Sequence, residues 1–249
     1  MFFMTIQKMA SSNLILFSIT FAFLMQTSFG IDPLFHFCSN SSNFIAKSTY
    51  ESNLKTLVNS LINKTPSTGF GIGSVGPAKY QNQKVYGLTL CRGDVSNLEC
   101  KTCVSQASKE VLNLCPYNKG AIVWYDNCMI KYLNTNFFGK IDNANKFSLL
   151  NVENVANPTK FNNMSKDLLS LLANEASMDH KFYASGELKI GESHRVYGLS
   201  QCTRDLSSVD CKKCLDDAIS ELIPNGKKGG RVVGGSCNIR YEIYPFVEE

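Results

Sequence analysis

The chain of 249 residues has no long hydrophobic run after its first thirty residues. A helix that crosses a bilayer needs about 20 mostly apolar residues, so this part of the sequence predicts no membrane-spanning helix. The first thirty residues do hold an apolar core, Leu14 to Met25, but it is twelve residues long and a single charge, Lys8, precedes it. A short core of this kind is typical of a cleaved signal peptide, which we assign to residues 1–30.

Cleavage is expected after Gly30, because Ser28 and Gly30 put small residues at the −3 and −1 positions of the site. The mature chain then begins at Ile31, and we expect neither a transmembrane anchor nor a lipid-anchor signal in it. These features predict a secreted protein. Three sequons for N-glycosylation fit that compartment and begin at Asn40, Asn63 and Asn163.

The sequence has little net charge and few histidines. Without Lys8 it carries 24 basic and 21 acidic side chains, and its most basic stretch, GKKGGR at 226–231, is best explained as a glycine-rich turn. No nucleic-acid partner is therefore expected. His36, His180 and His194 show no zinc-ligand spacing relative to the cysteines, so we expect neither a metal nor a cofactor. No nucleophile with a paired base and no glycosidase-like carboxylate pair stands out, which argues against an enzyme.

All ten cysteines lie in the expected mature chain, and two pairs of them form CxxC motifs. In principle a CxxC is a metal clamp, a redox dithiol or two half-cystines. Disulfides persist in an oxidising compartment and a free thiol is unusual there, so the even count favours disulfides.

The chain contains an internal repeat. The segment KVYGLTLCRGDVSNLECKTCV at 84–104 aligns without gaps to RVYGLSQCTRDLSSVDCKKCL at 195–215, and CMIKY at 128–132 matches CNIRY at 237–241. This similarity predicts two tandem domains of about 105 residues each, at 31–139 and 147–246. The boundary is expected in the polar, turn-rich stretch from Lys140 to Phe147.

Each domain has the sequence pattern of an α+β fold. Ser48 to Glu51 has the form of a capping box at the start of a first helix. Apolar residues then recur at helical spacing, at Leu54, Leu57, Val58, Leu61 and Ile62 in the first domain and at Met164, Leu168, Leu171, Leu172 and Ala176 in the second. A second helix follows each CxxC, with stripes of Val104, Ala107, Val111 and Leu114, and of Leu215, Ala218, Ile219 and Leu222. Glycine-bounded segments rich in valine and aromatics predict the strands. We expect a small antiparallel sheet with two helices on one face, the other face being left for solvent or a partner.

The spacing C-x8-C-x2-C, preceded by VYGL and repeated in tandem, resembles the plant cysteine-rich repeat secretory proteins. Their unit is the ginkbilobin-2-homologous domain, also called the stress-antifungal domain or domain of unknown function 26. The closing segment GGRVVGGSCNIRYEIYPF at 229–246 shares the resemblance. It implies five disulfides, which are Cys38–Cys115, Cys91–Cys100, Cys103–Cys128, Cys202–Cys211 and Cys214–Cys237.

The second domain lacks one bond of this pattern, because Leu150 stands where the N-terminal cysteine would be. Closing the long loop from Cys38 to Cys115 is worth about 4 kcal/mol in the chain-entropy model, and the short loops give less. We therefore expect the second domain to be the less stable one and to be cut first by a protease.

The resemblance also implies a sugar site, because ginkbilobin-like members bind mannose through an asparagine, an arginine and a glutamate at fixed distances from the cysteines. Guanidinium, carboxylate and amide groups suit adjacent sugar hydroxyls. The first domain has Ser39, Ile122 and Leu133 at these positions, which cannot do this. The second domain has Asn151, Arg231 and Glu242, with Asn154 as an alternative to Asn151. A competing interpretation is that Arg231 and Glu242 form an exposed cross-strand ion pair that serves only the sheet.

The tripeptide Arg92-Gly93-Asp94 spells an integrin-binding motif, but the second repeat has Thr203-Arg204-Asp205, and we interpret the match as coincidence. The resemblance implies a secreted, lectin-like or antifungal-type glycoprotein of plant stress or defence in the apoplast, not an enzyme, that binds a mannose-type carbohydrate through the second domain. The alternative hypothesis is a module that binds an extracellular protein, such as a receptor or a cell-wall partner, and no sugar.

Overall fold

The computed structural model describes residues 32–39, 42–190, 194–223 and 225–247. The predicted signal peptide, the cleavage site before Ile31 and the sequon at Asn40 lie outside the described residues. Within those ranges no helix is long and apolar enough to cross a bilayer. The other two sequon asparagines, Asn63 and Asn163, are exposed on helices.

The first domain consists of five strands, two helices and a short 3-10 turn. In chain order they are β1 (Phe35–Cys38), α2 (Thr49–Thr68), β2 (Phe70–Val75), η1 (Gln81–Gln83), β3 (Val85–Cys91), α3 (Asn97–Leu114), β4 (Gly120–Trp124) and β5 (Cys128–Leu133). The strands form one antiparallel sheet in the order β1-β4-β5-β3-β2.

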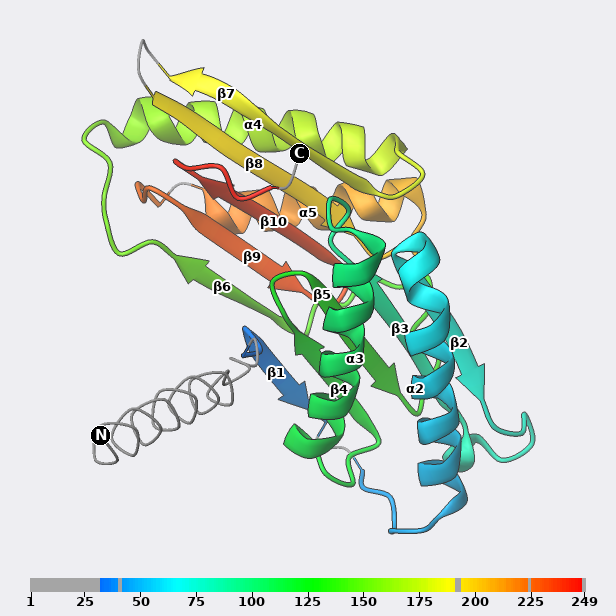
Figure 1. The fold of residues 1–249 in the computed structure, drawn as a ribbon. Helices are drawn as coiled ribbons and strands as arrows, with labels where there is room; N and C mark the ends of the chain where they lie inside the picture. The colour runs from blue at the N-terminus through cyan, green and yellow to red at the C-terminus, as the bar shows by residue number, and fades with distance from the viewer. Residues whose placement is uncertain (1–31, 40–41, 191–193, 224, 248–249) are drawn as a thin grey trace, which may run out of the picture. The chain divides into compact units, whose positions relative to one another are not determined.

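The second domain repeats this arrangement. Its elements are β6 (Lys146–Leu150), α4 (Pro158–Met178), β7 (Tyr183–Ile190), β8 (His194–Cys202), α5 (Ser208–Leu222), β9 (Gly230–Gly234) and β10 (Cys237–Glu242). The sheet order β6-β9-β10-β8-β7 matches the first sheet strand for strand. In each domain both helices cover one face of the sheet (Figure 1). The predicted fold class, two disulfide-stapled α+β domains, is confirmed.

The predicted helix faces are largely those that pack on the sheets, with one error. The four α5 residues are all buried, as are Leu54, Leu57, Val58 and Leu61 of α2. Leu171 of α4 is 55% exposed, because the buried stripe passes through Leu168, Leu169 and Leu172 instead. The capping box forms at Ser96 and Glu99 of α3. At α2 it is only half formed, because the Glu51 carboxylate bonds to the Lys47 N–H and not back to Ser48.

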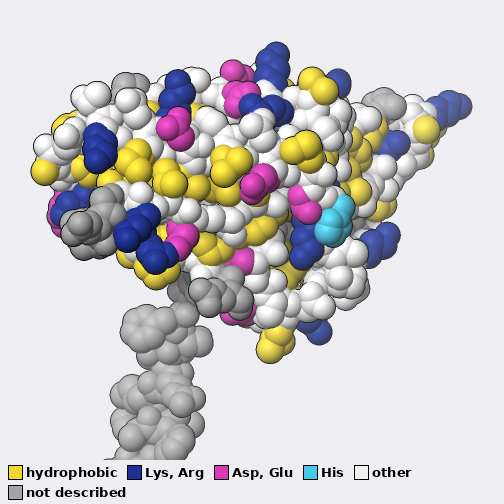
Figure 2. Space-filling view, turned by 90° about the horizontal axis from the view of Figure 1, so that it is seen from above, with side chains coloured by type: hydrophobic (Ala, Val, Ile, Leu, Met, Phe, Trp, Pro, Cys, Tyr) yellow, Lys and Arg dark blue, Asp and Glu magenta, His cyan; other side chains and the backbone are white. Residues whose placement is uncertain are grey.

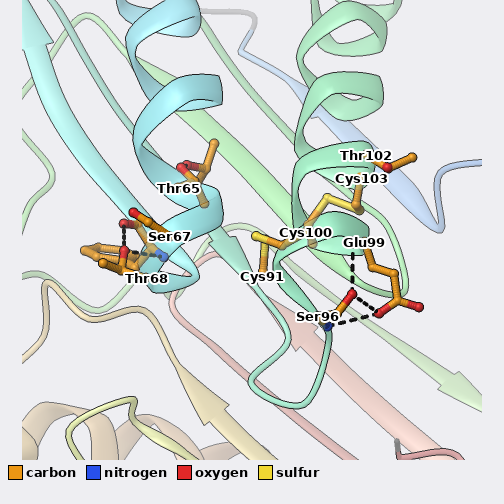
Figure 3. Close-up of a disulfide and its surroundings, with 12 residues drawn as sticks. Thr65, Ser67, Thr68, Cys91, Ser96, Glu99, Cys100, Thr102 and Cys103 are labelled. Carbon is orange, nitrogen blue, oxygen red and sulfur yellow. Dashed lines mark hydrogen bonds between the residues drawn. A yellow bond between two sulfur atoms is a disulfide. The ribbon is translucent and has the colours of Figure 1, made fainter.

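Five disulfides staple the helices to the sheets, and they join the pairs that the resemblance implies. Cys91 at the end of β3 bonds to Cys100 in the first turn of α3, next to the Ser96–Glu99 capping box (Figure 3). Cys103, one turn further along α3, bonds to Cys128 at the start of β5. All ten cysteines are thus in disulfides, which leaves no thiolate for a redox motif or a thiolate zinc site.

The sheet faces turned away from the helices meet in a third apolar cluster. From the first domain it contains Leu88, Ile122 and Trp124, and from the second Val233 with Phe147 packed beside it. The Trp124 indole N–H donates to the Gly234 carbonyl at 3.0 Å, which joins β4 to β9. The face that we expected to be left for solvent or a partner therefore packs, in the first domain, against the second domain of the same chain.

Charges of both signs are mixed on the surface. On the face shown in Figure 2, basic and acidic side chains lie singly among hydrophobic and neutral ones, without a block of one sign. This face therefore lacks the continuous positive potential that attracts a phosphate backbone.

Candidate functional site

The three residues implied by the sugar-binding resemblance lie on neighbouring strands of the second sheet. Arg231 is in β9, Glu242 ends β10, and Asn151 directly follows β6. The Asn151 N–H donates to the Gly229 carbonyl at 2.9 Å. The Glu242 carboxylate fills the space where a side chain at Gly229 would lie. Because Gly229 and Arg231 are two residues apart in extended chain, they share one face of the sheet. The fold therefore brings the three residues together around Gly229.

Arg231 is buried beneath the first domain, with 6% of its surface exposed. Its Nη1 donates to Oδ1 of Asp126 at 2.6 Å, and its Nε to Oδ1 of Asn238 at 3.4 Å. Asp126 comes from the turn between β4 and β5. The guanidinium is therefore paired with a carboxylate of the first domain. It is buried, so it is not exposed to a ligand in solution.

Glu242 is also buried, with 9% of its surface exposed. Its Oε1 accepts from Nε of Arg240 at 3.2 Å, while its Oε2 is buried and has no hydrogen-bond donor from the protein. An exposed ion pair between Arg231 and Glu242 was the competing interpretation. That interpretation is wrong, because both side chains are buried and, among the described residues, each pairs with a different partner.

The charges around Glu242, some buried and some partly exposed, form a balanced cluster. Arg240 lies 3.6 Å from Asp126, so two guanidinium groups and two carboxylates alternate from Arg231 through Asp126 and Arg240 to Glu242. Burial raises the pKa of the Asp126 carboxyl, but Arg231 outweighs this, helped by Arg240, and the pKa lies below its ordinary value. Burial lowers the pKa of Arg231, which Asp126 opposes. The cluster has zero net charge, which suits an uncharged ligand with hydroxyl donors, but its unpaired acceptor, Glu242 Oε2, is buried, so a donor reaches it only when the covering side chains move aside.

Asp126 is the residue of this cluster that sequence reasoning missed. Its side chain is 46% exposed, so one edge of the carboxylate faces solvent while the other holds Arg231. It belongs to the first domain, and its role depends on a contact between positions more than a hundred residues apart. A pattern read within one repeat cannot predict such a contact.

The first domain has apolar residues where the second has Arg231 and Glu242. By strand register Ile122 matches Arg231, and Leu133 matches Glu242. The Leu133 side chain covers Gly120 as the Glu242 carboxylate covers Gly229. Because Ile122 is 2% exposed and lies in the apolar cluster between the sheets, this position in the first domain serves packing.

The asparagines after β6 differ in their positions. Asn151 is bonded to Gly229 through its backbone, and its side-chain Oδ1 accepts from the Glu153 N–H at 2.9 Å. Asn154 forms an isolated bridge with Lys227, which is farther from Glu242 along the chain. Asn151 is therefore the asparagine nearer to the Glu242 carboxylate, because both contact Gly229.

A small cavity lies between the domains beside Arg231. It measures about 40 Å³, and Arg92, Trp124, Asp126, Gln201 and Arg231 are among the residues that line it. This volume holds about one water molecule, which is far less than a sugar ring needs. A sugar can therefore reach the cluster only at its outer side, where Asp126 is exposed.

The Arg92-Gly93-Asp94 tripeptide is too buried to bind a partner protein. The Arg92 guanidinium donates two hydrogen bonds to the Asp94 carboxylate, at 2.6 and 2.8 Å. The two side chains are 7% and 4% exposed. The ring of Tyr183 from β7 covers Gly93 so closely that a Cβ would not fit. These contacts bury the motif at the domain interface.

The fold and the disulfides define a tandem, disulfide-stapled α+β protein, and comparison with known proteins identifies its family. The family model described as salt stress response/antifungal matches residues 37–135 and 150–244. The chain is 59% identical over 220 residues to an antimicrobial ginkbilobin-2-like protein of Castanea crenata, covering 87% of this chain and 90% of the relative. It is 53% identical over 221 residues to cysteine-rich repeat secretory protein 38 of Arabidopsis thaliana, covering 86% of each. The chain belongs to this family of cysteine-rich proteins with two tandem stress-antifungal domains.

Solved structures agree with this assignment. The tandem DUF26 ectodomain of the Arabidopsis thaliana cysteine-rich receptor-like protein PDLP5 superposes with a TM-score of 0.73 at 29% identity. It covers 86% of this chain and 100% of the PDLP5 chain. The ectodomain of PDLP8 gives a TM-score of 0.75 at 24% identity, which shows a shared fold.

Proposed function

We propose that this protein is secreted into the plant apoplast and acts there, without catalysis, as a lectin-like protein of stress or defence. The names of the relatives, one antimicrobial and one secretory, support this assignment. The signal peptide at residues 1–30 and glycosylation of Asn40, Asn63 and Asn163 belong to the same proposal.

The proposed ligand is a mannose-type glycan at the charge cluster of the second domain. The observation that carries this proposal is the Glu242 Oε2, a buried carboxylate oxygen with no protein donor. Leaving such an acceptor unsatisfied costs about 1–3 kcal/mol, and a sugar hydroxyl would supply the missing donor. Asn151 and the exposed edge of Asp126 flank the site and offer further polar groups. In this proposal Arg231 is a positioning residue, because its hydrogen bond holds Asp126 in place.

Isothermal titration of the secreted protein with mannose and with yeast mannan tests the proposal. Glu242→Gln keeps the shape of the side chain and removes the charge, so we expect it to weaken mannan binding by about tenfold or more. Glu221→Gln is the matched control, because Glu221 is an exposed carboxylate on α5 paired with Lys146 and should bind mannan like the native protein. Absence of mannan binding by the native protein at about 1 mM sugar would refute the proposal.

A second candidate function, binding of an extracellular protein, is favoured by exposed apolar side chains on two edge strands. β1 and β6 each form one edge of a sheet, and they expose Phe35 (44%), Leu149 (43%) and Leu150 (49%). The rings of Phe35 and Phe147 are 5.1 Å apart, so the two edges are continuous. An exposed apolar edge of this kind is typical of a strand that pairs with a partner.

The probe for this second candidate is the ectodomain of cysteine-rich receptor-like protein kinase 25 of Arabidopsis thaliana, a relative 35% identical over 246 residues. Leu149→Lys should weaken its binding by about tenfold in biolayer interferometry, whereas Val209→Lys, at a more exposed position on α5 (78% against 43%), should not. If the native protein does not bind this ectodomain, or if both variants bind alike, the second candidate fails for this partner.

A further inference from the structure

An apolar hollow opens at the start of α4, on the helix-covered side of the second sheet. We name it the α4 hollow; its volume is about 390 Å³. Its walls are mainly apolar and include Val155, Phe161, Ile190 and Ile243. Sites for small organic ligands have this character, with about 300–1,000 Å³ of largely apolar space. The hollow is separate from the Glu242 carboxylate, which faces the first domain.

The matching place in the first domain is built differently. The Val155 N–H donates to the Gly226 carbonyl at 2.9 Å, as the Phe44 N–H does to Tyr117 at 2.7 Å, so Val155 and Phe44 are equivalent. Gly226 and Tyr117 also share a left-handed backbone, with φ of 69° and 64°. In the first domain the Phe44 ring packs against Tyr50, with centroids 5.4 Å apart. The first domain also has a hollow here, of about 440 Å³, and the Phe44 ring is part of its wall. In the second domain the smaller Val155 takes this position in the wall.

The lining of the two places differs in polarity as well. In the first domain the surface hollow near Phe44 is lined largely by polar side chains such as Asn43, Ser48 and Asn82. The α4 hollow has apolar walls at its centre and cationic side chains at its rim. The two equivalent hollows therefore differ in lining: mostly polar in the first domain, and apolar with a cationic rim in the second.

Three cations, Lys160, Arg195 and Lys228, line the rim of the α4 hollow. Arg195 pairs with Glu187, and Lys228 pairs with Glu153 at 2.5 Å. No acidic side chain in the described parts of the chain pairs with the Lys160 ammonium. Lys160 also lies in the first turn of α4, where the helix dipole is positive and a further cation is unfavourable. The rim therefore has an excess of positive charge next to apolar walls.

We propose that the α4 hollow binds a small monocarboxylate with an apolar body. The alkyl or aromatic part would lie against Phe161, Ile190 and Ile243, and the carboxylate would pair with Lys160. Transfer of the apolar part from water gives about 0.8 kcal/mol per buried CH₂ in general, so most of the affinity comes from the hollow and the charge selects the ligand. This ligand class is independent of the proposed glycan site.

Isothermal titration with decanoate on the intact secreted protein tests the proposal. We expect binding with a dissociation constant below about 1 mM, and weaker binding of decanol by about fivefold or more. Lys160→Gln should weaken decanoate binding by about fivefold, to the level of decanol. Lys166→Gln is the matched control, because Lys166 is exposed on the same helix and does not line the hollow.

A second variant tests the apolar part of the site. Val155→Phe places in the second domain the residue that the first domain already has, and it should abolish decanoate binding while leaving mannan binding and the melting temperature unchanged. Absence of decanoate binding by the native protein, equal binding of decanol and decanoate, or unchanged binding by a folded Val155→Phe protein would each overturn the proposal. Because Lys160 is exposed, its variant remains informative if Val155→Phe does not fold.

Discussion

Replacing Cys38 and Cys115 together by alanine should lower the free energy of unfolding by about 4 kcal/mol, one of the two largest effects expected in this chain. The bond closes a loop with a sequence separation of 77 residues, and it ties the edge strand β1 to the residue that ends α3. In the unfolded chain its loss frees a large number of conformations. In the folded chain β1 keeps its pairing with β4 and the ring contacts of Phe35 and Phe37.

The matched control is the double alanine variant of Cys202 and Cys211, whose sequence separation is 9. The same chain-entropy relation gives about 2.5 kcal/mol for so short a loop. Guanidinium unfolding followed by circular dichroism measures both values. Equal losses in the two variants would mean that loop length does not determine the stabilisation.

The second domain has no counterpart of the Cys38–Cys115 disulfide, and this difference affects the relative stability of the two domains. Leu150, which stands in place of Cys38, lies close to Gly230 together with Leu222, so an apolar contact is present at the strand that lacks the disulfide. Packing of two leucines recovers some stability but does not restrict the unfolded chain. Limited proteolysis of the native protein should therefore still cut the second domain first, and removal of the Cys38–Cys115 bond should abolish this order.

Sequence reasoning predicted the elements whose pattern is local. Helical spacing located α2, α3 and α5 with their buried faces, because a stripe of period 3.6 needs no knowledge of the partner. Two strands were missed, β1 and β6. They are edge strands of four and five residues with no glycine-bounded valine-rich run, and the expected domain boundary, Lys140 to Phe147, overlaps the first two residues of β6.

The apolar composition of β3 and β4 is a sequence feature that indicates the domain interface. All residues of β3 and β4 are buried, and segments such as Ala121 to Trp124 are apolar on both faces. A strand apolar on both faces belongs to a sheet that is covered on both sides. The helices cover one face of the first sheet, and the second domain covers the other face. The same contact buries Arg231, and a pattern within one repeat does not reveal this burial.

The second large effect is expected at the ion pair between Lys131 of β5 and Asp142 of the domain connection. The two side chains are 2% and 9% exposed, and Nζ lies 2.6 Å from Oδ2. In the second domain Gly235 stands where the first has Asp126, and the Asp142 carboxylate fills the space beside Gly235. Asp142 and Asp126 thus hold equivalent cations, Lys131 and Arg240, in the two halves of the interface.

Asp142→Asn should lower the free energy of unfolding by about 3–5 kcal/mol, because a buried ammonium loses its counter-ion. Lys131→Met should cost less, because the Asp142 carboxylate still accepts hydrogen bonds from the N–H groups of Ala144 and Asn145. Urea unfolding measures both. The control is Lys55→Met, which removes a pair of similar length with Glu51 on the surface of α2, and it should change stability by about 0.5 kcal/mol or less.

The same pair predicts the acid limit of stability. Burial raises the pKa of the Asp142 carboxyl, but Lys131 and the donors from Asn145 outweigh this and hold the pKa below its ordinary value. A carboxyl with a lowered pKa in the folded state stabilises the fold above its unfolded pKa, near 3.9 for aspartate, and this stabilisation is lost as the pH falls through the folded pKa. Native stability should therefore stay level above about pH 5 and decline below about pH 4. Asp142→Asn should be less stable at neutral pH and show a shallower acid decline, whereas an unchanged decline would assign the acid sensitivity to other carboxylates, Asp126 first among them.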